Sequence, residues 1–277
     1  MQRPLSLVSS ASLYGRSVLK VLGRRRRLAP EERLVFVTGC PRSGTTFVAG
    51  ALASQPGFVD LGEVHPLKAA IPTLVRLEEG DAALRLREVL DRVRRLGLVQ
   101  HLRGVEQSPE TAHVLPAALA AYPQAKAVHV VRDGRDVVCS LLERGWLSSG
   151  RAGADDARHP YGPQPRFWVE PERAEEFERS SDAGRAAWAW RIYVAAALAQ
   201  RERTIEVRYD EIATDPDAAA GRVAGFLHTE PEALARGFRK VHSRSVGRWR
   251  RDLDEVQLAD IEREAGPLLR ELGYADR

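Results

Sequence analysis

The segment "LVFVTGCPRSGTTF", residues 34–47, constrains the fold more than any other part of the chain. It begins as a short apolar run, breaks into a loop bounded by glycines, and continues into Thr45 and Thr46. A buried strand, a tight loop and a helix start in this order aim several backbone N–H groups at one point, where the helix N-terminus adds a positive field. The segment therefore predicts a phosphate-binding loop between a strand and a helix.

This loop differs from the nucleotide-hydrolysing motif G-x-x-x-x-G-K-[ST] at one position. Gly39 and Gly44 have the required spacing, but Thr45 stands where the motif has lysine. The long cation within the loop is Arg42, and a guanidinium can hold phosphate oxygens with two hydrogen bonds. We predict that the phosphate contacts come from Arg42, Ser43, Gly44, Thr45 and Thr46.

Three apolar runs, residues 34–38, 127–131 and 204–208, are typical of buried parallel strands. Helical patterns separate them, which is the signature of an α/β protein. We expect helices near residues 84–96, 186–200, 215–227 and 255–272. With 277 residues, 44% of them hydrophobic, the chain can build one sizeable core. The predicted fold is a single α/β domain with a central parallel β-sheet flanked by helices and a P-loop-like turn.

We divide the chain into an N-terminal basic extension, residues 1–32, and one domain, residues 33–277. The extension carries four consecutive arginines after a short apolar stripe, a pattern that favours a surface helix with a solvated end over a membrane-surface segment. Within the domain, residues 148–182 are rich in glycine, proline and charge, and predict a long loop. Such a loop is either a functional lid or a disordered segment.

The totals favour a cytoplasmic protein. The net charge of +4 favours anionic ligands only weakly, and we expect no nucleic-acid partner. No apolar run reaches the roughly 20 residues that span a bilayer, so we expect no stable membrane insertion. Cys40 and Cys139 are too few for a disulfide framework, which favours a reducing compartment.

A second candidate phosphate contact follows the second strand, in "AVHVVRDGRDVVCSLL". Arg132 falls at the carboxyl end of that strand, and Ser140 lies about two helical turns further on. Arg132 and Ser140 together can bind a second phosphate. The alternative is that Arg132 only forms an ion pair with Asp133 or Asp136. Tyr209 follows the third strand, where its ring either lines a base pocket or packs in the core.

Four motifs in order resemble those of sulfotransferases that use PAPS (3′-phosphoadenosine 5′-phosphosulfate). "GCPRSGTTF" resembles their 5′-phosphosulfate loop, and "VVRDGRDVVCS" is similar to their 3′-phosphate segment, with Arg132 and Ser140 at the family's positions. "VRYDEIATDP" and "SVGRWRRDL…LRELGY" resemble two further family elements. The pattern is most similar to the bacterial and tyrosylprotein branch, whose loop also contains P-R-S-G-T-T.

The resemblance implies transfer of a sulfuryl group from PAPS to an acceptor hydroxyl, with release of 3′,5′-ADP (PAP) and no metal. Arg42 would lie near the bridging oxygen, where charge develops as the bond breaks. The carboxyl-terminal segment, with Ser245 and Arg248, would close over the nucleotide, and residues 148–182 would lie on the acceptor side. The acceptor can be a small molecule, a natural product, a sugar or a peptide. The alternatives are an atypical P-loop kinase of small molecules, which would need Mg²⁺, and a non-catalytic PAP-binding protein.

The resemblance also implies a general base on the acceptor side. Glu63 in "FVDLGEVHPLK" stands where the tyrosylprotein branch has its catalytic glutamate, and His65 is the second candidate. The structural alternative is that Glu63 caps the helix that follows it. One departure is Gln107 in "VEQSPET", where many relatives have lysine. It removes a cation near the sulfuryl group, and another basic residue would have to replace it.

Overall fold

The computed structural model describes residues 20, 28–29, 32–94, 101–148, 166–200 and 202–274. Its centre is a five-stranded, fully parallel sheet in the order β2-β3-β1-β4-β5. The strands are β1 (Leu34–Thr38), β2 (Phe58–Gly62), β3 (Arg103–Glu106), β4 (Lys126–Val131) and β5 (Thr204–Arg208). The predicted parallel sheet is confirmed.

Two of the five strands were not predicted. The predicted runs correspond to β1, β4 and β5, whereas residues 58–62 and 103–106, which form β2 and β3, were not assigned as strands. The four residues of β3 begin with Arg103 and end with Glu106, and β2 contains Asp60 and a register shift between Asp60 and Gly62. Both strands form because β3 pairs with β1 and β2 pairs with β3, which is a tertiary effect.

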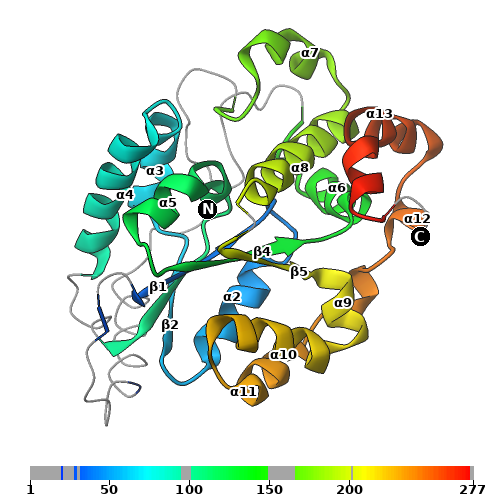
Figure 1. The fold of residues 1–277 in the computed structure, drawn as a ribbon. Coiled ribbons are helices and arrows are strands. Elements are labelled where there is room, and N and C mark those ends of the chain that lie inside the picture. Colours follow the sequence, from blue (N-terminus) through cyan, green and yellow to red (C-terminus); the bar gives the residue numbers. More distant parts are fainter. Residues whose placement is uncertain are drawn as a thin grey trace.

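Helices cover both faces of the sheet (Figure 1). Alternate residues of β1 point to opposite faces: Val35 and Val37 pack on one side, and Leu34 and Phe36 on the other. Burial on both faces explains why β1 is a continuous apolar run. The first face carries α2 (Thr45–Ser54), α10 (Pro216–Leu227) and α11 (Pro231–Phe238). The second carries α3 (His65–Leu74), α4 (Glu79–Arg94), α5 (Leu115–Ala121), α6 (Gly134–Arg144), α8 (Asp182–Leu198) and α13 (Glu255–Glu271).

Short helices complete the architecture: η3 (Pro109–Val114), η4 (Pro171–Arg173), α7 (Ala174–Arg179), α9 (Tyr209–Thr214), η5 (Ser243–Ser245) and α12 (Trp249–Asp252). Among the predicted helices, α10 and α13 are confirmed to within one residue. The cap of α10 is as expected, because the Asp215 carboxylate accepts a hydrogen bond from Ala218 N at 2.9 Å. Helix α8 begins four residues earlier than predicted, where Ser181 Oγ accepts from Gly184 N at 3.0 Å.

The predicted extension and loop lie partly outside the described residues, namely at residues 1–19, 21–27, 30–31 and 149–165. The described remainder of the predicted loop, residues 148 and 166–182, contains η4, α7 and the first residue of α8. The rings of Trp168 and Phe177 meet at 5.6 Å, and Phe177 meets Trp188 of α8 at 5.5 Å. This half of the segment is therefore helical in part and contributes to the core, because its aromatic side chains are buried there. Its place on the acceptor side stays a prediction.

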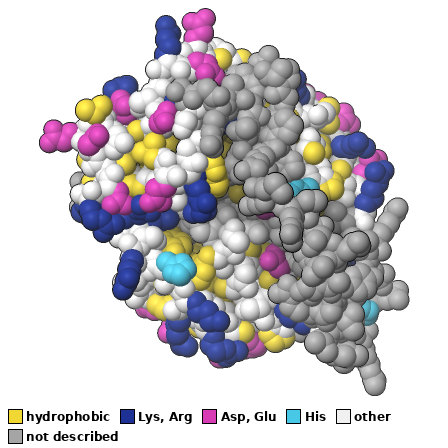
Figure 2. Space-filling view, turned by 180° about the vertical axis from the view of Figure 1, so that it is seen from behind, with side chains coloured by type: hydrophobic (Ala, Val, Ile, Leu, Met, Phe, Trp, Pro, Cys, Tyr) yellow, Lys and Arg dark blue, Asp and Glu magenta, His cyan; other side chains and the backbone are white. Residues whose placement is uncertain are grey.

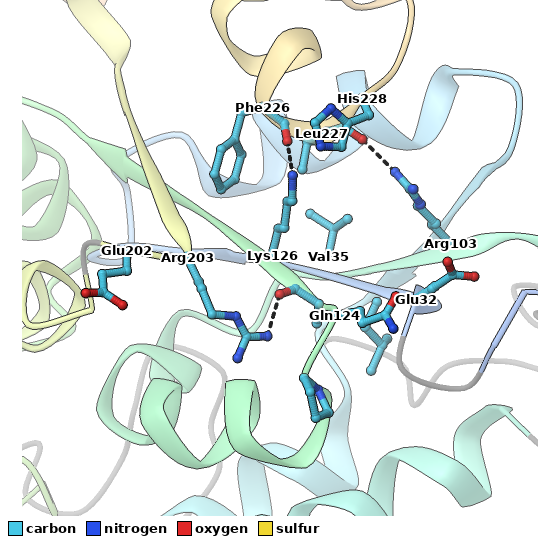
Figure 3. A pocket seen from close by; sticks show the side chains of 13 residues that line it. Glu32, Val35, Arg103, Gln124, Lys126, Glu202, Arg203, Phe226, Leu227 and His228 are labelled. Atoms are coloured by element: carbon cyan, nitrogen blue, oxygen red, sulfur yellow. Dashed lines mark hydrogen bonds between the residues drawn. The ribbon is translucent and has the colours of Figure 1, made fainter.

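A pocket of about 420 Å³ lies at the amino ends of the strands (Figure 3). The cations that line it are bound to carbonyl oxygens: Arg103 donates to Leu227 O at 2.7 Å, Lys126 to Phe226 O, and Arg203 to Ala125 O at 2.7 Å. Burial lowers the pKa of all three side chains. Basic side chains at the carboxyl ends of helices satisfy carbonyls that lack helical partners. This pocket is at the edge of the sheet opposite the predicted phosphate-binding loop.

On the face shown in Figure 2, Lys and Arg side chains lie beside Asp and Glu side chains. Local ion pairs of the described residues include Arg173–Glu176 at 2.9 Å and Arg222–Glu211 at 2.5 Å. Much of the positive charge is thus compensated locally. Within the described residues, no helix is both long enough and apolar enough to cross a membrane.

Candidate active site

The sheet topology brings the two predicted phosphate contacts together. The central strand β1 has β3 on one side and β4 on the other, and after β1 the chain moves toward the β2 edge. The order of strands reverses between β1 and β4, and ligands of open α/β sheets bind at the carboxyl edge of such a switch point. The loop after β1, residues 39–44, and the turn after β4, which begins at Arg132, therefore lie side by side.

Residues 39–44, hereafter the phosphate loop, have an unusual backbone. Gly39 and Gly44 have φ of 152° and 99°, and Arg42 has φ of 73° without being glycine. Left-handed conformations at such residues cost free energy and persist where the surrounding structure enforces them. Here they turn the chain sharply from β1 into α2, whose first residue is Thr45. The predicted strand–loop–helix order is present, with backbone N–H groups at the start of α2.

Direct contacts join this loop to the second anchor, which consists of Arg132 and Ser140. Arg42 Nε donates to Ser140 Oγ at 2.9 Å, and one terminal nitrogen of Arg132 donates to Arg42 O at 3.2 Å. The Arg132 guanidinium also lies 5.1 Å from the centre of the Tyr209 ring. Arg42, Arg132, Ser140 and Tyr209 thus converge, although they are distant in sequence.

The simple ion-pair alternative for Arg132 is weak in the structure. Asp133 pairs with Arg135 at 2.7 Å, and Asp136 is 3.9 Å from Arg132. Burial lowers the pKa of Arg132, whose ordinary value is so high that the group stays a cation at neutral pH. Among the described residues, the buried atoms Arg132 Nε and Ser43 Oγ have no hydrogen-bond partner. Two unsatisfied donors beside the phosphate loop fit a ligand that supplies anionic oxygens.

Tyr209 packs directly on the phosphate loop. It is 5% exposed, and its ring meets the Phe47 ring edge-on at 6.1 Å. A Cβ atom at Gly44 would lie 2.6 Å from the Tyr209 ring, so glycine is required there for packing as well as for its positive φ. Both predicted roles of Tyr209, packing and a base-pocket wall, are compatible with this position. Its contact with a nucleotide stays a prediction.

The first testable prediction follows from Gly44. We expect Gly44→Ala to lower the free energy of unfolding by about 1–3 kcal/mol, because it combines a strained backbone with a clash against Tyr209. Urea unfolding measures this loss. The matched control is Gly50→Ala in α2, where a Cβ meets no atom within 4 Å among the described residues. That change should be neutral or stabilising by up to about 1 kcal/mol. Equal behaviour of the two variants would contradict the prediction.

The carboxyl-terminal segment is docked beside the second anchor. The Asp136 carboxylate accepts from Gly247 N at 2.8 Å and from Trp249 N at 3.1 Å. Arg132 donates to Ser245 O, so the second anchor touches the same segment. Ser245 therefore lies beside Arg132, and its contact with a nucleotide stays a prediction. Sequence reasoning missed the role of Asp136, and the doubled aspartate of "RDGRD" was the available signal.

Arg248 lies in this segment, and its guanidinium is hydrogen-bonded to two carboxylates. It donates to Glu143 at 3.1 Å and to Asp252 at 2.6 Å. These hydrogen bonds raise the pKa of Arg248 and lower the pKa of both carboxyl groups. Arg248 would have to leave these partners to reach a nucleotide, and that role stays a prediction. Trp146, which the sequence reasoning missed, has Arg42 over its ring at 5.6 Å.

On the other side of the phosphate loop, Glu63 follows β2 at the same carboxyl edge. Its side chain is 35% exposed and accepts from Lys68 Nζ at 2.8 Å. The helix-cap alternative does not hold, because the N-cap residue of α3 is Val64. His65 is the first residue of α3 and is exposed. Glu63 is thus partly accessible at the carboxyl edge of the sheet, and its catalytic role stays a prediction.

Gln107 follows β3 and is 7% exposed, and its N–H donates to Gly62 O at 3.2 Å. The preceding carboxyl group, Glu106, accepts from Ser108 N at 2.8 Å and from Thr111 Oγ1 at 2.9 Å. Burial raises the pKa of Glu106 to about 7. These contacts fix the turn from β3 into η3, and they place Gln107 next to the end of β2.

Residues 81–232, more than half of the chain, match the model of the sulfotransferase family. The chain belongs to the sulfotransferase family. The match includes Arg132, Ser140 and Tyr209 and ends before the docked carboxyl-terminal segment. Membership confirms the family that the four motifs predicted.

Two curated relatives of this family member match it over part of their length. A putative protein-tyrosine sulfotransferase of Caenorhabditis briggsae is 28% identical over 135 residues, which are 45% of this chain and 48% of the relative. An uncharacterized protein of Aquifex aeolicus is 30% identical over 137 residues, which are 43% of this chain and 18% of that protein. The alignments thus span less than half the length of these relatives.

Solved sulfotransferase structures share the fold. The sulfotransferase domain of the Synechococcus olefin synthase has a TM-score of 0.53 at 17% identity, covering 85% of this chain and 94% of that one. The sulfotransferase domain of the curacin biosynthetic pathway has a TM-score of 0.55 at 15% identity, covering 90% and 99%. A mouse sulfotransferase solved with PAP has a TM-score of 0.52 at 13% identity, covering 95% and 93%. The predicted α/β architecture is the sulfotransferase fold.

Proposed function

We propose that this family member transfers a sulfuryl group from PAPS to an acceptor hydroxyl and releases PAP. The observation that carries the proposal is the contact between the phosphate loop and the second anchor, 2.9 Å from Arg42 Nε to Ser140 Oγ. PAPS has anionic groups at both the 5′ and 3′ positions of its ribose. The phosphate loop would hold the 5′-phosphosulfate, and Arg132 with Ser140 would hold the 3′-phosphate.

In the proposed reaction the acceptor oxygen attacks sulfur in line, and the bond from sulfur to the bridging oxygen of PAPS breaks. Glu63 takes the acceptor's proton, and the bridging oxygen leaves with its electron pair on PAP. Arg42 stabilises the charge that develops on that oxygen. The chemistry has no β,γ-phosphate pair for a helix lysine to bridge, which accounts for Thr45 in the lysine position. The remaining catalysis is positioning by the two anchors.

Two alternatives make different demands. A kinase would depend on Mg²⁺, whereas a non-catalytic PAP-binding protein would bind PAP without turnover. Gln107 in place of a lysine is the observation that favours the second alternative. The proposed acceptor is a hydroxyl compound of small-molecule, natural-product, sugar or peptide class, and the proposed location is cytoplasmic. Neither a metal nor a nucleic acid takes part in the proposed reaction.

The second testable prediction concerns ligand stabilisation. We expect PAP to raise the Tm in the presence of EDTA, and to do so more than ADP or ATP at equal concentration. Only PAP presents phosphates to both anchors, and a ligand that binds the native state stabilises it by mass action. Thermal unfolding measures the shifts, and Mg-ATP serves as the competing ligand. A larger shift with Mg-ATP than with PAP would favour the kinase.

Sulfuryl transfer itself is tested with ³⁵S-labelled PAPS across a panel of phenols, alkyl alcohols, sugars and tyrosine peptides. Label that moves to an acceptor, with equimolar release of PAP, would support the enzyme. The Arg42→Ala variant is the matched negative control, because it removes the proposed charge stabilisation at the bridging oxygen. PAP binding without label transfer to any acceptor would favour the non-catalytic alternative.

A further inference from the structure

Lys68 is a buried lysine in α3 with carboxylates on two sides. It is 1% exposed, and its Nζ is 2.8 Å from Glu63 Oε2 and 3.0 Å from Glu110 Oε1. Glu110 belongs to η3 and is fully buried. A buried ammonium is costly unless it is paired and hydrogen-bonded. The three side chains therefore form one charge cluster, hereafter the Lys68 cluster.

The members of the Lys68 cluster differ in their access to solvent. Glu110 is inaccessible behind Lys68, whereas the Glu63 side chain is 35% exposed at the carboxyl edge of the sheet. The two segments that supply the carboxylates are cross-linked: Val64 N donates to Ser108 Oγ at 3.1 Å, and Gln107 N donates to Gly62 O at 3.2 Å. These bonds fix the separation of the segments. Glu110 thus forms an ion pair with Lys68 on the buried side, and Lys68 forms an ion pair with the partly exposed Glu63 on the other side.

We propose that Lys68 is a positioning residue that orients the Glu63 carboxylate through a charge pair, with Glu110 as its buried support. This inference rests on the proposed function, in which Glu63 accepts the proton of the acceptor hydroxyl. A carboxyl group that is already protonated cannot accept that proton. The cluster also places a cation from α3 on the side of the site where Gln107 provides none.

The electrostatics of the cluster give opposite signs for two substitutions. Loss of the Lys68 ammonium removes the cation that lies 2.8 Å from Glu63 Oε2, which favours the protonated form of Glu63; the buried carboxyls Glu110 and Glu106, which interact with each other, remain on the inner side. Loss of the Glu110 charge removes a negative charge from the far side of Lys68 and keeps the Lys68–Glu63 pair, which favours the ionised form of Glu63. If Lys68 only stabilised the fold, neither substitution would shift the acid limb of the pH dependence of kcat.

The experiment is the pH dependence of kcat at saturating PAPS for Lys68→Met and Glu110→Gln, which keep side-chain size nearly constant. For Lys68→Met we expect the acid limb to move up by roughly one pH unit, so that kcat falls by up to about tenfold at pH values on that limb. For Glu110→Gln we expect the acid limb to move down. The KM for PAPS should stay within about twofold of wild type in both, because the phosphate contacts are untouched.

The matched control is Lys126→Met, the same substitution at the opposite edge of the sheet, where Lys126 donates to Phe226 O. It should lower the Tm while leaving the acid limb in place. A wild-type acid limb in folded Lys68→Met, or an equal shift in Lys126→Met, would overturn the inference. If Lys68→Met does not fold, an upward or absent shift in Glu110→Gln overturns it instead. Absence of sulfuryl transfer in the wild-type protein would overturn the proposed function itself, and is thereby distinguished from a failure confined to the variants.

Discussion

Glu63→Gln is expected to lower turnover about 10²–10⁴-fold while PAP binding persists. The amide has nearly the size and hydrogen-bonding capacity of the carboxylate, but it cannot take the proton of the acceptor hydroxyl. The structure places Glu63 at the carboxyl edge of the sheet, apart from the contacts that join Arg42 and Ser140. Loss of the base should therefore act on kcat, and the nucleotide contacts should be preserved. The measurement is kcat at saturating PAPS together with the Kd for PAP.

His65→Ala is the comparison for this prediction, because His65 is the second candidate base and is exposed at the start of α3. We expect its turnover to remain within about threefold of wild type, since an exposed side chain that does not take the acceptor's proton contributes little to turnover. Near-normal turnover in Glu63→Gln would rule out Glu63 as the base. A collapse of turnover only in His65→Ala would transfer the role to His65.

Arg132→Ala is expected to weaken PAP binding far more than binding of adenosine 5′-phosphosulfate. The second ligand lacks the 3′-phosphate that Arg132 is proposed to hold. A charge-assisted hydrogen bond contributes about 1.5–3 kcal/mol, or roughly 10- to 150-fold in Kd. Arg132 also donates to Arg42 O and Ser245 O, so its loss disturbs the loop for both ligands. The ratio of the two losses therefore isolates the 3′ contact, and calorimetric titration of both ligands measures it.

Ser140→Ala is a milder substitution at the same proposed 3′-phosphate site as Arg132→Ala, because it removes one neutral hydroxyl and no charge. We expect a smaller loss of PAP affinity, about 0.5–1.5 kcal/mol, again greater for PAP than for adenosine 5′-phosphosulfate. The hydroxyl also accepts from Arg42, so some loss for both ligands is expected. Equal losses for the two ligands in both variants would show that this pair does not hold the 3′-phosphate.

Local sequence was sufficient for the elements that set the centre of the fold. A strand covered on both faces must be an apolar run, and β1, which is buried along its whole length, has the predicted bounds for that reason. The phosphate loop was equally visible, because its positive-φ positions require glycine at Gly39 and Gly44. The cap at Asp215 marked the start of α10. In each case the physical requirement acts within a few residues of chain.

The strand pairings and the second half of the predicted loop needed the tertiary structure. Strand β3 has four residues, of which Arg103 and Glu106 are charged, and β2 contains Asp60 and a register shift, so their extended form depends on the neighbours they pair with. Residues 166–181 are rich in charge, yet Trp168 and Phe177 are buried against helices from other parts of the chain. A composition-based loop prediction cannot anticipate a core that is assembled from distant segments.

For the candidate site, the sequence by itself determined which residues carry charge at strand ends, including Arg42, Arg132 and Glu63. Only the tertiary structure decided their partners. Lys68 looks like an ordinary surface residue in its helix, and it becomes a buried cation because η3 brings Glu110 against α3. Charge pairing acts over a few ångströms in space, whatever the separation along the chain, and so depends on which elements the sheet makes neighbours.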